Sequence, residues 1–265
     1  SGLRDLRARG FYLSPAREGW VDDPQGIDFI VHPRGTGPRE GEVLHRISVV
    51  DERECIAFRN IQGITLAVVD EESDITYFET SRFEPNGVVK SKPPQASGEL
   101  FGDRILVWDP PVELHERRFY GQLLSNRSGE TGPLQLSLVE GAHLATQGQL
   151  ELVSNEESIV KRGRTVEGEH FDRRLRIYQE LRSRGLVPKT GFKFGADFRV
   201  YGEFTTVEEM GHSDFLVRVI SPDYEVAPRD LALDVRLAHG VRKQMVFARP
   251  TEDEICWLAV SRLTP

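Results

Sequence analysis

The sequence predicts a mixed α/β (α+β) protein, with two repeated α/β domains and a small α/β domain between them. Three observations support this class: an internal repeat, strand-like runs that alternate with helical patterns, and a globular composition. Of 265 residues, 38% are hydrophobic and 29% are charged, which excludes collagen-like, low-complexity and mostly disordered chains. The length is also sufficient for a large buried core.

Two pairs of matching segments carry the repeat. DLRARGFYL at residues 5–13 is answered by ELRSRGLVP at residues 180–188, and each marks a helix-like end closed by glycine. AVVDEESDITYFETSRFEP at residues 67–85 aligns with ARPTEDEICWLAVSRLTP at residues 248–265. Two copies of about 80 residues indicate a duplicated domain rather than a solenoid.

The first repeat is expected at residues 1–86. Strand-like runs in it lie at residues 27–31, 44–49, 64–68 and 75–79, and a short helix is expected near residues 54–61. The following run, NGVVKSKPPQASG, is rich in Pro, Gly, Ser and Lys. This composition is typical of an exposed linker, which we assign to residues 87–98.

The middle of the chain predicts a small α/β domain at residues 99–155. Its strand-like runs lie at residues 104–108 and 134–137, and a helical pattern follows at residues 138–150. A basic connecting helix is then expected at residues 156–186. In it, Phe171, Leu175, Tyr178 and Leu181 are spaced four, three and three residues apart, and Gly185 is placed to end the helix.

The second repeat is expected at residues 187–265. Strands are predicted at residues 198–202, 215–220, 244–248 and 255–260, with a helix near residues 228–242. That helix should turn Leu231, Val235 and Ala238 inward.

The net charge of −8 speaks at first against a nucleic-acid partner, but the charge is unevenly distributed. Residues 156–265 hold 18 basic and 18 acidic side chains, which leaves 16 basic and 24 acidic ones in residues 1–155. The excess therefore lies entirely in the first part. Residues 156–186 are locally basic, and we expect most of their arginines on a solvated helix face of mixed charge.

Targeting and metal-binding signals are absent from the sequence. No apolar run approaches the ~18 residues that span a bilayer, and the sequence opens without a secretory pattern, so a cytoplasmic protein away from membranes is expected. Cys55 and Cys256 alone make neither a disulfide scaffold nor a closed zinc site. The seven histidines show no metal-ligand spacing, so no metal site is expected.

Three titratable residues distinguish the second repeat from the first. Tyr201 closes a strand, His212 lies in a Gly-His-Ser loop, and Lys243 lies where a helix meets a strand. The corresponding places in the first repeat hold His32, Arg39 or Glu40, and Gly63. This is the pattern that duplication followed by specialisation leaves, because the fold needs the apolar positions and not these three side chains.

Tyrosine, histidine and lysine together suit metal-free cleavage of a phosphodiester beside a ribose. One group removes the 2′-hydroxyl proton, a second protonates the leaving 5′-oxygen, and a cation stabilises the charge of the transition state. Histidine is the natural acid near neutral pH. From residue type alone, each of the three also fits a structural or solvated role.

Longer motifs carry a resemblance to a known family. KTGFKFGADFRVY at residues 189–201, GHSDFLVRVI at residues 211–220, RLAHGVRKQMVFA at residues 236–248 and the terminal ICWLAVSRLTP occur in that order. In these runs the chain resembles the archaeal tRNA-splicing endonucleases. Upstream, ERRFYGQLL and LSLVEGAHLATQGQLEL are similar to the small N-terminal domain that precedes the catalytic domain in that family.

The resemblance implies two repeated endonuclease-type domains and an endoribonuclease acting on precursor tRNA at bulge–helix–bulge junctions. It implies that Tyr201 is the general base, His212 the general acid and Lys243 the stabilising cation. Cleavage would leave a 2′,3′-cyclic phosphate and a 5′-hydroxyl, with no metal or cofactor required. Arg236 and Arg262 match two arginines that hold a bulged base in the family, which suits recognition of RNA by shape.

The resemblance also implies a role for an acidic loop in the first repeat. Its acidic residues are Asp70, Glu71, Glu72 and Asp74, and taken alone they suit a solvated turn. In the family, the equivalent loop inserts into a basic cleft of the partner chain, which implies a homodimer of two-module chains. The second repeat has only a shorter acidic turn at residues 251–254.

Other hypotheses stay open at the level of sequence. One is a non-catalytic RNA-binding or assembly subunit of a splicing endonuclease; another is a metal-dependent nuclease using Asp197 and nearby acids. Two-module family members usually begin with a further small domain, whereas this sequence opens on residues 3–10. A shortened architecture and an additional domain outside this sequence both agree with that.

Overall fold

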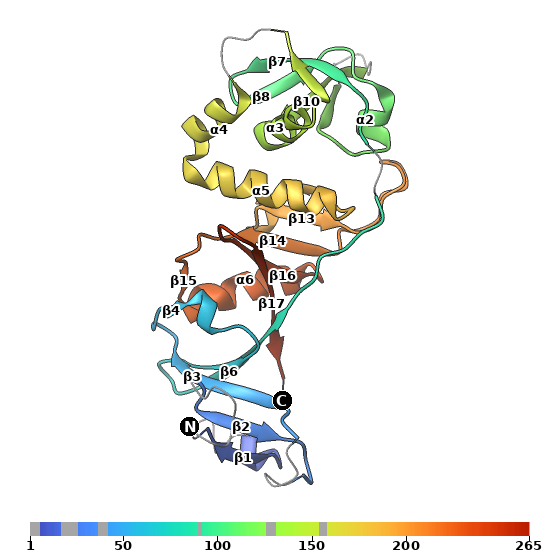
Figure 1. Ribbon diagram of the computed structural model, residues 1–265. Helices are drawn as coiled ribbons and strands as arrows, with labels where there is room; N and C mark the ends of the chain where they lie inside the picture. The colour runs from blue at the N-terminus through green and yellow to red at the C-terminus, as the bar shows by residue number, and fades with distance from the viewer. Residues whose placement is uncertain are drawn as a thin grey trace. The chain divides into compact units, whose positions relative to one another are not determined.

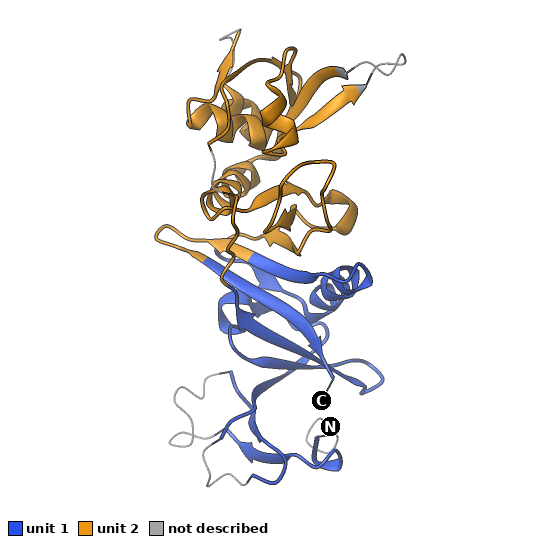
Figure 2. Ribbon diagram, turned by 90° about the vertical axis from the view of Figure 1, so that its right-hand side faces the viewer, with its two compact units in different colours: residues 1–83, 222–247, 256–265 blue, residues 84–221, 248–255 orange. Residues whose placement is uncertain are grey.

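The computed structural model describes residues 6–16, 26–36, 42–89, 92–125, 131–153 and 158–264. The chain falls into two compact units, coloured separately in Figure 2. Unit 1 comprises residues 1–83, 222–247 and 256–265, and unit 2 comprises residues 84–221 and 248–255. The second repeat therefore contributes residues to both units.

Unit 1 contains the strands of the first repeat (Figure 1). In spatial order they are β1 (Tyr12–Pro15), β2 (Phe29–His32), β3 (His45–Asp51), β5 (Thr65–Val69) and β6 (Ile75–Arg82). Neighbours run antiparallel except β3 and β5, which run parallel. The four predicted strands are confirmed with small shifts at their ends, while β1 was not predicted. Their inward side chains, among them Val31, Ile47, Ala67 and Tyr77, form one buried cluster.

The second repeat provides strands to both units. The strands that lie wholly in unit 2 are β12 (Val187–Thr190), β13 (Phe198–Tyr201) and β14 (Phe215–Val219), and a 3-10 turn, η3 (Phe192–Phe194), lies between the first two. β15 (Glu225–Val226), α6 (Pro228–Gly240), β16 (Gln244–Pro250) and β17 (Ile255–Leu263) follow. Pro228 opens α6, where its missing N–H costs nothing, and Leu231, Val235 and Ala238 are buried as predicted.

Strand order supports the duplication. The order β1-β2-β3-β5-β6 of the first repeat is matched by β12-β13-β14-β16-β17 in the second. The last strands of the two copies, β6 and β17, pair antiparallel, with Ser81 opposite Ala259. A second pair joins β15 to β4 (Ile56–Ala57). β4 of the first copy and β15 of the second thus have equivalent positions, since each follows the third strand of its copy and precedes the fourth.

The helix expected near residues 54–61 is wrong. The segment forms β4 followed by one 3-10 turn, η2 (Phe58–Asn60). The Phe58 N–H donates to the carbonyl of Tyr224 (3.0 Å), and its buried ring packs against Phe247. Because Ile56 and Ala57 pair with β15 and Phe58 is fixed by its contacts, too few residues remain here for an α-helix. The second copy has α6 at the corresponding place.

The small domain lies in unit 2 and has a five-stranded sheet. In spatial order its strands are β11 (Leu150–Leu152), β7 (Ala96–Phe101), β8 (Arg104–Val107), β10 (Thr131–Ser137) and β9 (Gln122–Ser125). Its helices are α2 (Val112–Glu116) and α3 (Leu138–Thr146). Ser137 and Glu140 form a capping box that fixes the start of α3. The predicted runs at residues 104–108 and 134–137 are therefore strands, and the predicted helix ends earlier than residue 150.

The segment expected as an exposed linker is bonded at both ends. Gly87, Val88 and Val89 donate backbone hydrogen bonds to Arg184, Gly202 and Gly185, and the last three residues already belong to β7. A side chain at Gly87 would overlap the backbone of Gly185, so only glycine allows this approach. Composition did not reveal these contacts, because backbone groups make them.

The basic segment at residues 156–186 forms two helices rather than one. They are α4 (Ile159–Glu167) and α5 (Glu169–Ser183), separated by Gly168 at φ +63°. The predicted apolar face of α5 is buried. Four ion pairs join residues within this segment: Arg164 with Asp172, Arg173 with Glu169, Arg174 with Glu167, and Arg184 with Glu180. Half of its eight basic side chains are thus paired with carboxylates of the same segment.

A buried ion pair joins the small domain to β12. Lys189 Nζ lies 2.6 Å from Glu140 Oε1 and also donates to the carbonyls of Phe119 (3.1 Å) and Gly121 (3.0 Å). Both charged side chains are more than nine-tenths buried. Lys189 therefore holds the segment from Phe119 to Gly121 against the first strand of the second repeat. Among the described residues, no helix has the length and hydrophobicity needed to cross a membrane.

Candidate active site

Tyr201 is the last residue of β13 and is only 3% exposed. It forms a small buried cluster with Phe119 and Val187, and its ring meets that of Phe119 edge-on with centroids 5.9 Å apart. Burial raises the pKa of the Tyr201 phenol, and the nearby Arg199 guanidinium partly opposes this shift. The phenol is thus held rigidly in a largely apolar setting.

His212 lies near the far end of the loop that follows Tyr201 and is exposed. Asp214 closes this loop: its carboxylate accepts from the Gly202 N–H (2.5 Å), and its own N–H donates to the Val200 carbonyl (2.8 Å). These two bonds bring the two ends of the loop together. These bonds form the closed neck of the loop. Tyr201 lies at one side of this neck and His212, eleven residues later in the sequence, lies near the other.

The loop between them packs on the small domain. Phe204 stacks on Phe119 with centroids 5.1 Å apart and ring planes 7° from parallel. The Val207 N–H donates to the Glu116 carbonyl (3.1 Å) at the end of α2. Phe119 itself has φ +51°, an uncommon conformation for a bulky residue, which turns its ring toward the loop. Residues 116–119 thus support the loop that carries His212.

Lys243 follows α6 and belongs to unit 1, whereas Tyr201 and His212 belong to unit 2. The Lys243 N–H donates to the Ala238 carbonyl (2.9 Å), and Arg242 before it has φ +56°. This is the Schellman arrangement that ends a helix, formed here around an arginine instead of glycine. It places Lys243, half-buried, at the entry to β16.

Arg236 and Arg262 are both exposed and both belong to unit 1. Arg236 lies on the outward side of α6, one residue after the buried Val235. Arg262 lies near the end of β17, opposite Phe78 of β6. Both guanidinium groups are thus accessible to a ligand, as the resemblance requires.

In the first repeat, the corresponding positions are structural. His32 is buried, with Nε2 2.5 Å from the Ser14 hydroxyl and Nδ1 2.7 Å from the Glu42 carbonyl. Gly63 forms a turn at φ +73°. Arg39 and Glu40 lie outside the described residues. A histidine held in this way by two neighbours has no free nitrogen for acid–base chemistry.

The acidic loop joins β5 to β6 and is preformed. Asp70 Oδ1 accepts from the N–H groups of Glu72 (3.0 Å) and Asp74 (2.8 Å), and Ser73 has φ +65°. Glu71 lies 2.5 Å from Arg53, and both side chains remain largely exposed. Asp70 thus shapes the turn, whereas Glu72 and Asp74 present their carboxylates to solvent.

Asp197, the candidate acid for a metal-dependent nuclease, is occupied structurally. Its Oδ1 lies 2.8 Å from His170 and 3.2 Å from Arg174, and its Oδ2 accepts from the Val219 N–H (2.8 Å). Within the described ranges, no three His, Cys, Asp or Glu side chains are grouped to hold a metal ion. The contacts of Asp197 therefore favour a role in fixing α5 to the strands.

Sequence reasoning missed the residues that support the loop. Asp214 and Phe119 lie inside the quoted motifs, but their roles depend on contacts across 12 and 85 residues of sequence. The Arg117-Arg118 pair was also not singled out, although two adjacent arginines after a short helix were visible.

Comparisons with known proteins identify two family domains in this chain. The family model for the tRNA intron endonuclease N-terminal domain matches residues 96–163, and that for its catalytic C-terminal domain matches residues 171–257. These ranges contain the small domain and Tyr201, His212, Arg236 and Lys243.

Similar full-length relatives are archaeal proteins. The chain is 54% identical over 264 residues to the tRNA-splicing endonuclease of Haloarcula marismortui and 56% identical over 264 residues to that of Natronomonas pharaonis. Each match covers 99% of this chain and 78% of the relative. The tRNA-splicing endonuclease of Methanosarcina mazei is 34% identical over 281 residues, covering 98% of this chain and 75% of its own. This chain is therefore an endonuclease that belongs to the tRNA-splicing endonuclease family.

Proposed function

We propose that the protein is a cytoplasmic endoribonuclease that cleaves precursor tRNA at intron–exon junctions in bulge–helix–bulge structures without a metal ion. One observation carries the proposal. Tyr201 and His212 flank the closed neck of one loop, in the region that matches the family's catalytic domain. A base and an acid on the two sides of one neck suit the two proton transfers of RNA transesterification.

In the proposed reaction, Tyr201 removes the proton of the 2′-hydroxyl at the junction. The 2′-oxygen then attacks the adjacent phosphorus, and the bond from phosphorus to the 5′-oxygen breaks. His212 gives a proton to that leaving oxygen, so the products are a 2′,3′-cyclic phosphate and a 5′-hydroxyl. Lys243 stabilises the negative charge that develops on the phosphoryl oxygens.

Substrate selection is proposed to rest on Arg236 and Arg262. A guanidinium plane stacks on an extruded base without reading its sequence, which suits recognition of a bulge by shape. Both side chains are exposed, on α6 and β17. No part of this mechanism requires a bound cofactor.

Excess EDTA is expected to leave junction cleavage unchanged, because side chains supply the base, the acid and the cation. The measurement is incubation of the purified protein with a bulge–helix–bulge RNA, followed by end-group analysis. Resistance of the upstream product to phosphatase until mild acid opens the ring would identify the cyclic phosphate. Loss of cleavage in EDTA that Mg²⁺ restores, or a 5′-phosphate on the downstream product, would contradict the proposal.

We further propose that the chain works as a homodimer in which the acidic loop of one chain docks on its partner. The support is the preformed turn at residues 70–74, which presents Glu72 and Asp74 to solvent without a rearrangement. A preformed turn loses little conformational entropy on docking, which favours binding.

Reversing two charges in this loop is expected to weaken the dimer. For Glu72→Lys combined with Asp74→Lys, we expect the dimer dissociation constant to rise on the order of 100-fold, because like charges then face each other. Sedimentation equilibrium measures this constant. The matched control is Glu252→Lys with Asp253→Lys in the acidic turn of the second repeat, which should dimerise normally. Equal dimerisation by both double variants would contradict the docking role.

A further inference from the structure

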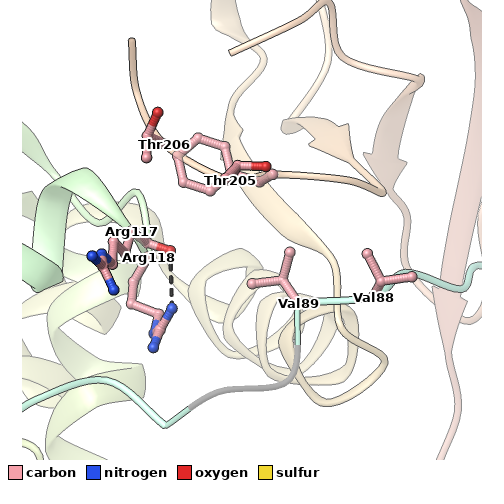
Figure 3. Close-up of a pocket in the computed structure, with 7 residues that line it drawn as sticks. Val88, Val89, Arg117, Arg118, Thr205 and Thr206 are labelled. Carbon is pink, nitrogen blue, oxygen red and sulfur yellow. Dashed lines mark hydrogen bonds between the residues drawn. The ribbon is translucent and has the colours of Figure 1, made fainter. Parts of the chain in front are cut away.

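A cavity of about 380 Å³ lies in unit 2 beside the loop that carries His212 (Figure 3). Its lining residues are Val88, Val89, Arg117, Arg118, Phe204, Thr205 and Thr206. The last three belong to the loop between Tyr201 and His212, and the arginines follow α2 of the small domain. The two valines come from the segment before β7. The cavity therefore has one wall from the catalytic loop and one from the small domain.

The polar part of this lining is cationic. It holds two guanidinium groups and two hydroxyls, and no carboxylate. Arg118 Nη1 donates to the carbonyl of Arg117 (3.1 Å), as the dashed line in Figure 3 marks, while its Nε is buried and meets no acceptor among the described residues. The Nη atoms of Arg118 and the guanidinium of Arg117 are thus the groups that can donate to an anion in the cavity.

The contrast with the basic helices makes this charge informative. Of the basic segment at residues 156–186, Arg164, Arg173, Arg174 and Arg184 are paired with carboxylates of the same chain. Its Arg162, Arg176 and Arg182 donate to backbone carbonyls instead. Arg117 and Arg118 have no carboxylate within ion-pair distance in the described part of the chain. Their positive charge is therefore left for a ligand.

The cavity walls are held in place before any ligand binds. Phe204 is stacked on Phe119, next to Arg118, and Val207 is bonded to Glu116. Arg182 of α5 also contributes, since its Nη1 donates to the Arg118 carbonyl (2.9 Å) and thereby fixes the backbone that carries the Arg118 side chain. A site that is already ordered loses little conformational entropy on binding.

Resting on the function proposed above, we propose that this cavity binds an internucleotide phosphate of the RNA substrate beside the cleaved junction. Guanidinium groups donate to phosphate oxygens in the fork geometry that suits a bidentate contact, and threonine hydroxyls complete such sites. A phosphate held here contacts both the small domain and the loop of His212. Binding there thus holds the RNA backbone next to the loop of His212.

Removing the two charges is expected to weaken RNA binding. The probe is a bulge–helix–bulge RNA with 2′-deoxy nucleotides at the junctions, which binds but lacks the attacking hydroxyl. Each neutralised arginine should lower its affinity about five- to tenfold at about 0.1 M salt, and the salt dependence should lose about one ion per contact. The variants are Arg117→Gln and Arg117→Gln with Arg118→Gln. Arg104→Gln, an exposed arginine of the same small domain, is the matched control.

The outcomes separate the cavity from the general function. If wild-type protein cleaves RNA but the Arg117 variants bind the deoxy probe with wild-type affinity and salt dependence, this inference is wrong and the proposed function stands. The exposed Arg117 keeps that test valid if the double variant fails to fold. If adenosine monophosphate binds to the wild type but not to Arg117→Gln in a titration, while the RNA affinity of the two proteins is the same, the cavity binds a free nucleotide instead. Absence of cleavage and binding by the wild type would overturn the proposed function itself.

Discussion

His212→Ala and Tyr201→Phe are each expected to lower the rate of junction cleavage by about 10²- to 10⁴-fold, the usual contribution of one acid or base. Each variant removes one proton transfer but leaves the loop closed, because Asp214 closes it through backbone groups of Gly202 and Val200. Affinity for the deoxy RNA probe should therefore stay close to wild type. A single-turnover assay at saturating enzyme measures the chemical step.

Matched changes elsewhere should have no such effect. Tyr12→Phe removes an exposed tyrosine hydroxyl from β1 of the first repeat and should cleave at the wild-type rate. Because burial raises the pKa of Tyr201, only a small fraction of its side chain is phenolate at neutral pH, and this fraction grows as the pH rises. The residual rate of His212→Ala, which lacks the acid, should show this alkaline rise, and the double variant with Tyr201→Phe should not. Wild-type rates in both active-site variants would remove Tyr201 and His212 from the mechanism.

Lys189→Met is expected to have the largest effect on stability. It leaves the Glu140 carboxylate buried without its cation, a change that typically costs about 3–5 kcal/mol. It also removes the donor to the carbonyls of Phe119 and Gly121, which position the support of the catalytic loop. Urea unfolding at neutral pH measures the loss. The double variant with Glu140→Gln should recover part of it, because no unpaired charge then remains.

Glu140 should also make the protein sensitive to acid. Burial alone would raise the pKa of this carboxyl, but the Lys189 charge and hydrogen bonds from Lys189, Ser137 and Gly121 lower it to about 2. A lowered carboxyl pKa stabilises the fold above the unfolded value of 4.5, and this contribution is lost as the pH falls toward 2. The loss is of the order of 3 kcal/mol. Lys189→Met should lack this part of the acid dependence.

Regular elements were predictable where local sequence decides the structure. The strands at β2, β3, β5 and β6 follow from short runs rich in apolar and β-branched residues, and α6 follows from the spacing of Leu231, Val235 and Ala238. The duplicated strand order follows from the repeat in the sequence. These features depend on neighbours within a few residues of each other.

Features that depend on distant contacts were not predictable. Residues 54–61 look helical, but β15 captures Ile56 and Ala57, and Phe58 fills a core formed with Phe247. The basic segment at residues 156–186 suggested one helix with a solvated face of mixed charge. Gly168 divides it into two helices, and carboxylates of the same segment pair with Arg164, Arg173, Arg174 and Arg184.

For the candidate site, the sequence yields residues but not their support. Family motifs single out Tyr201, His212 and Lys243, and the structure adds the bonds of Asp214 and the stacking of Phe204 on Phe119. The cationic cavity at Arg117 and Arg118 also appears only when the small domain and the loop are seen together. The candidate site thus draws on both matched domains, whereas Tyr201, His212 and Lys243 all lie in the range that matches the catalytic domain.

The assignment of His212 as the acid is tested most directly by changing the leaving atom. In an RNA with sulfur in place of the 5′-bridging oxygen at the junction, the leaving thiolate needs no proton, because thiols are far more acidic than alcohols. On this substrate, His212→Ala should cleave within about tenfold of wild type, whereas Tyr201→Phe should stay slow, because its missing step is removal of the 2′-hydroxyl proton. If sulfur leaves His212→Ala as slow as before, or restores Tyr201→Phe equally, the proposed division of acid and base is contradicted.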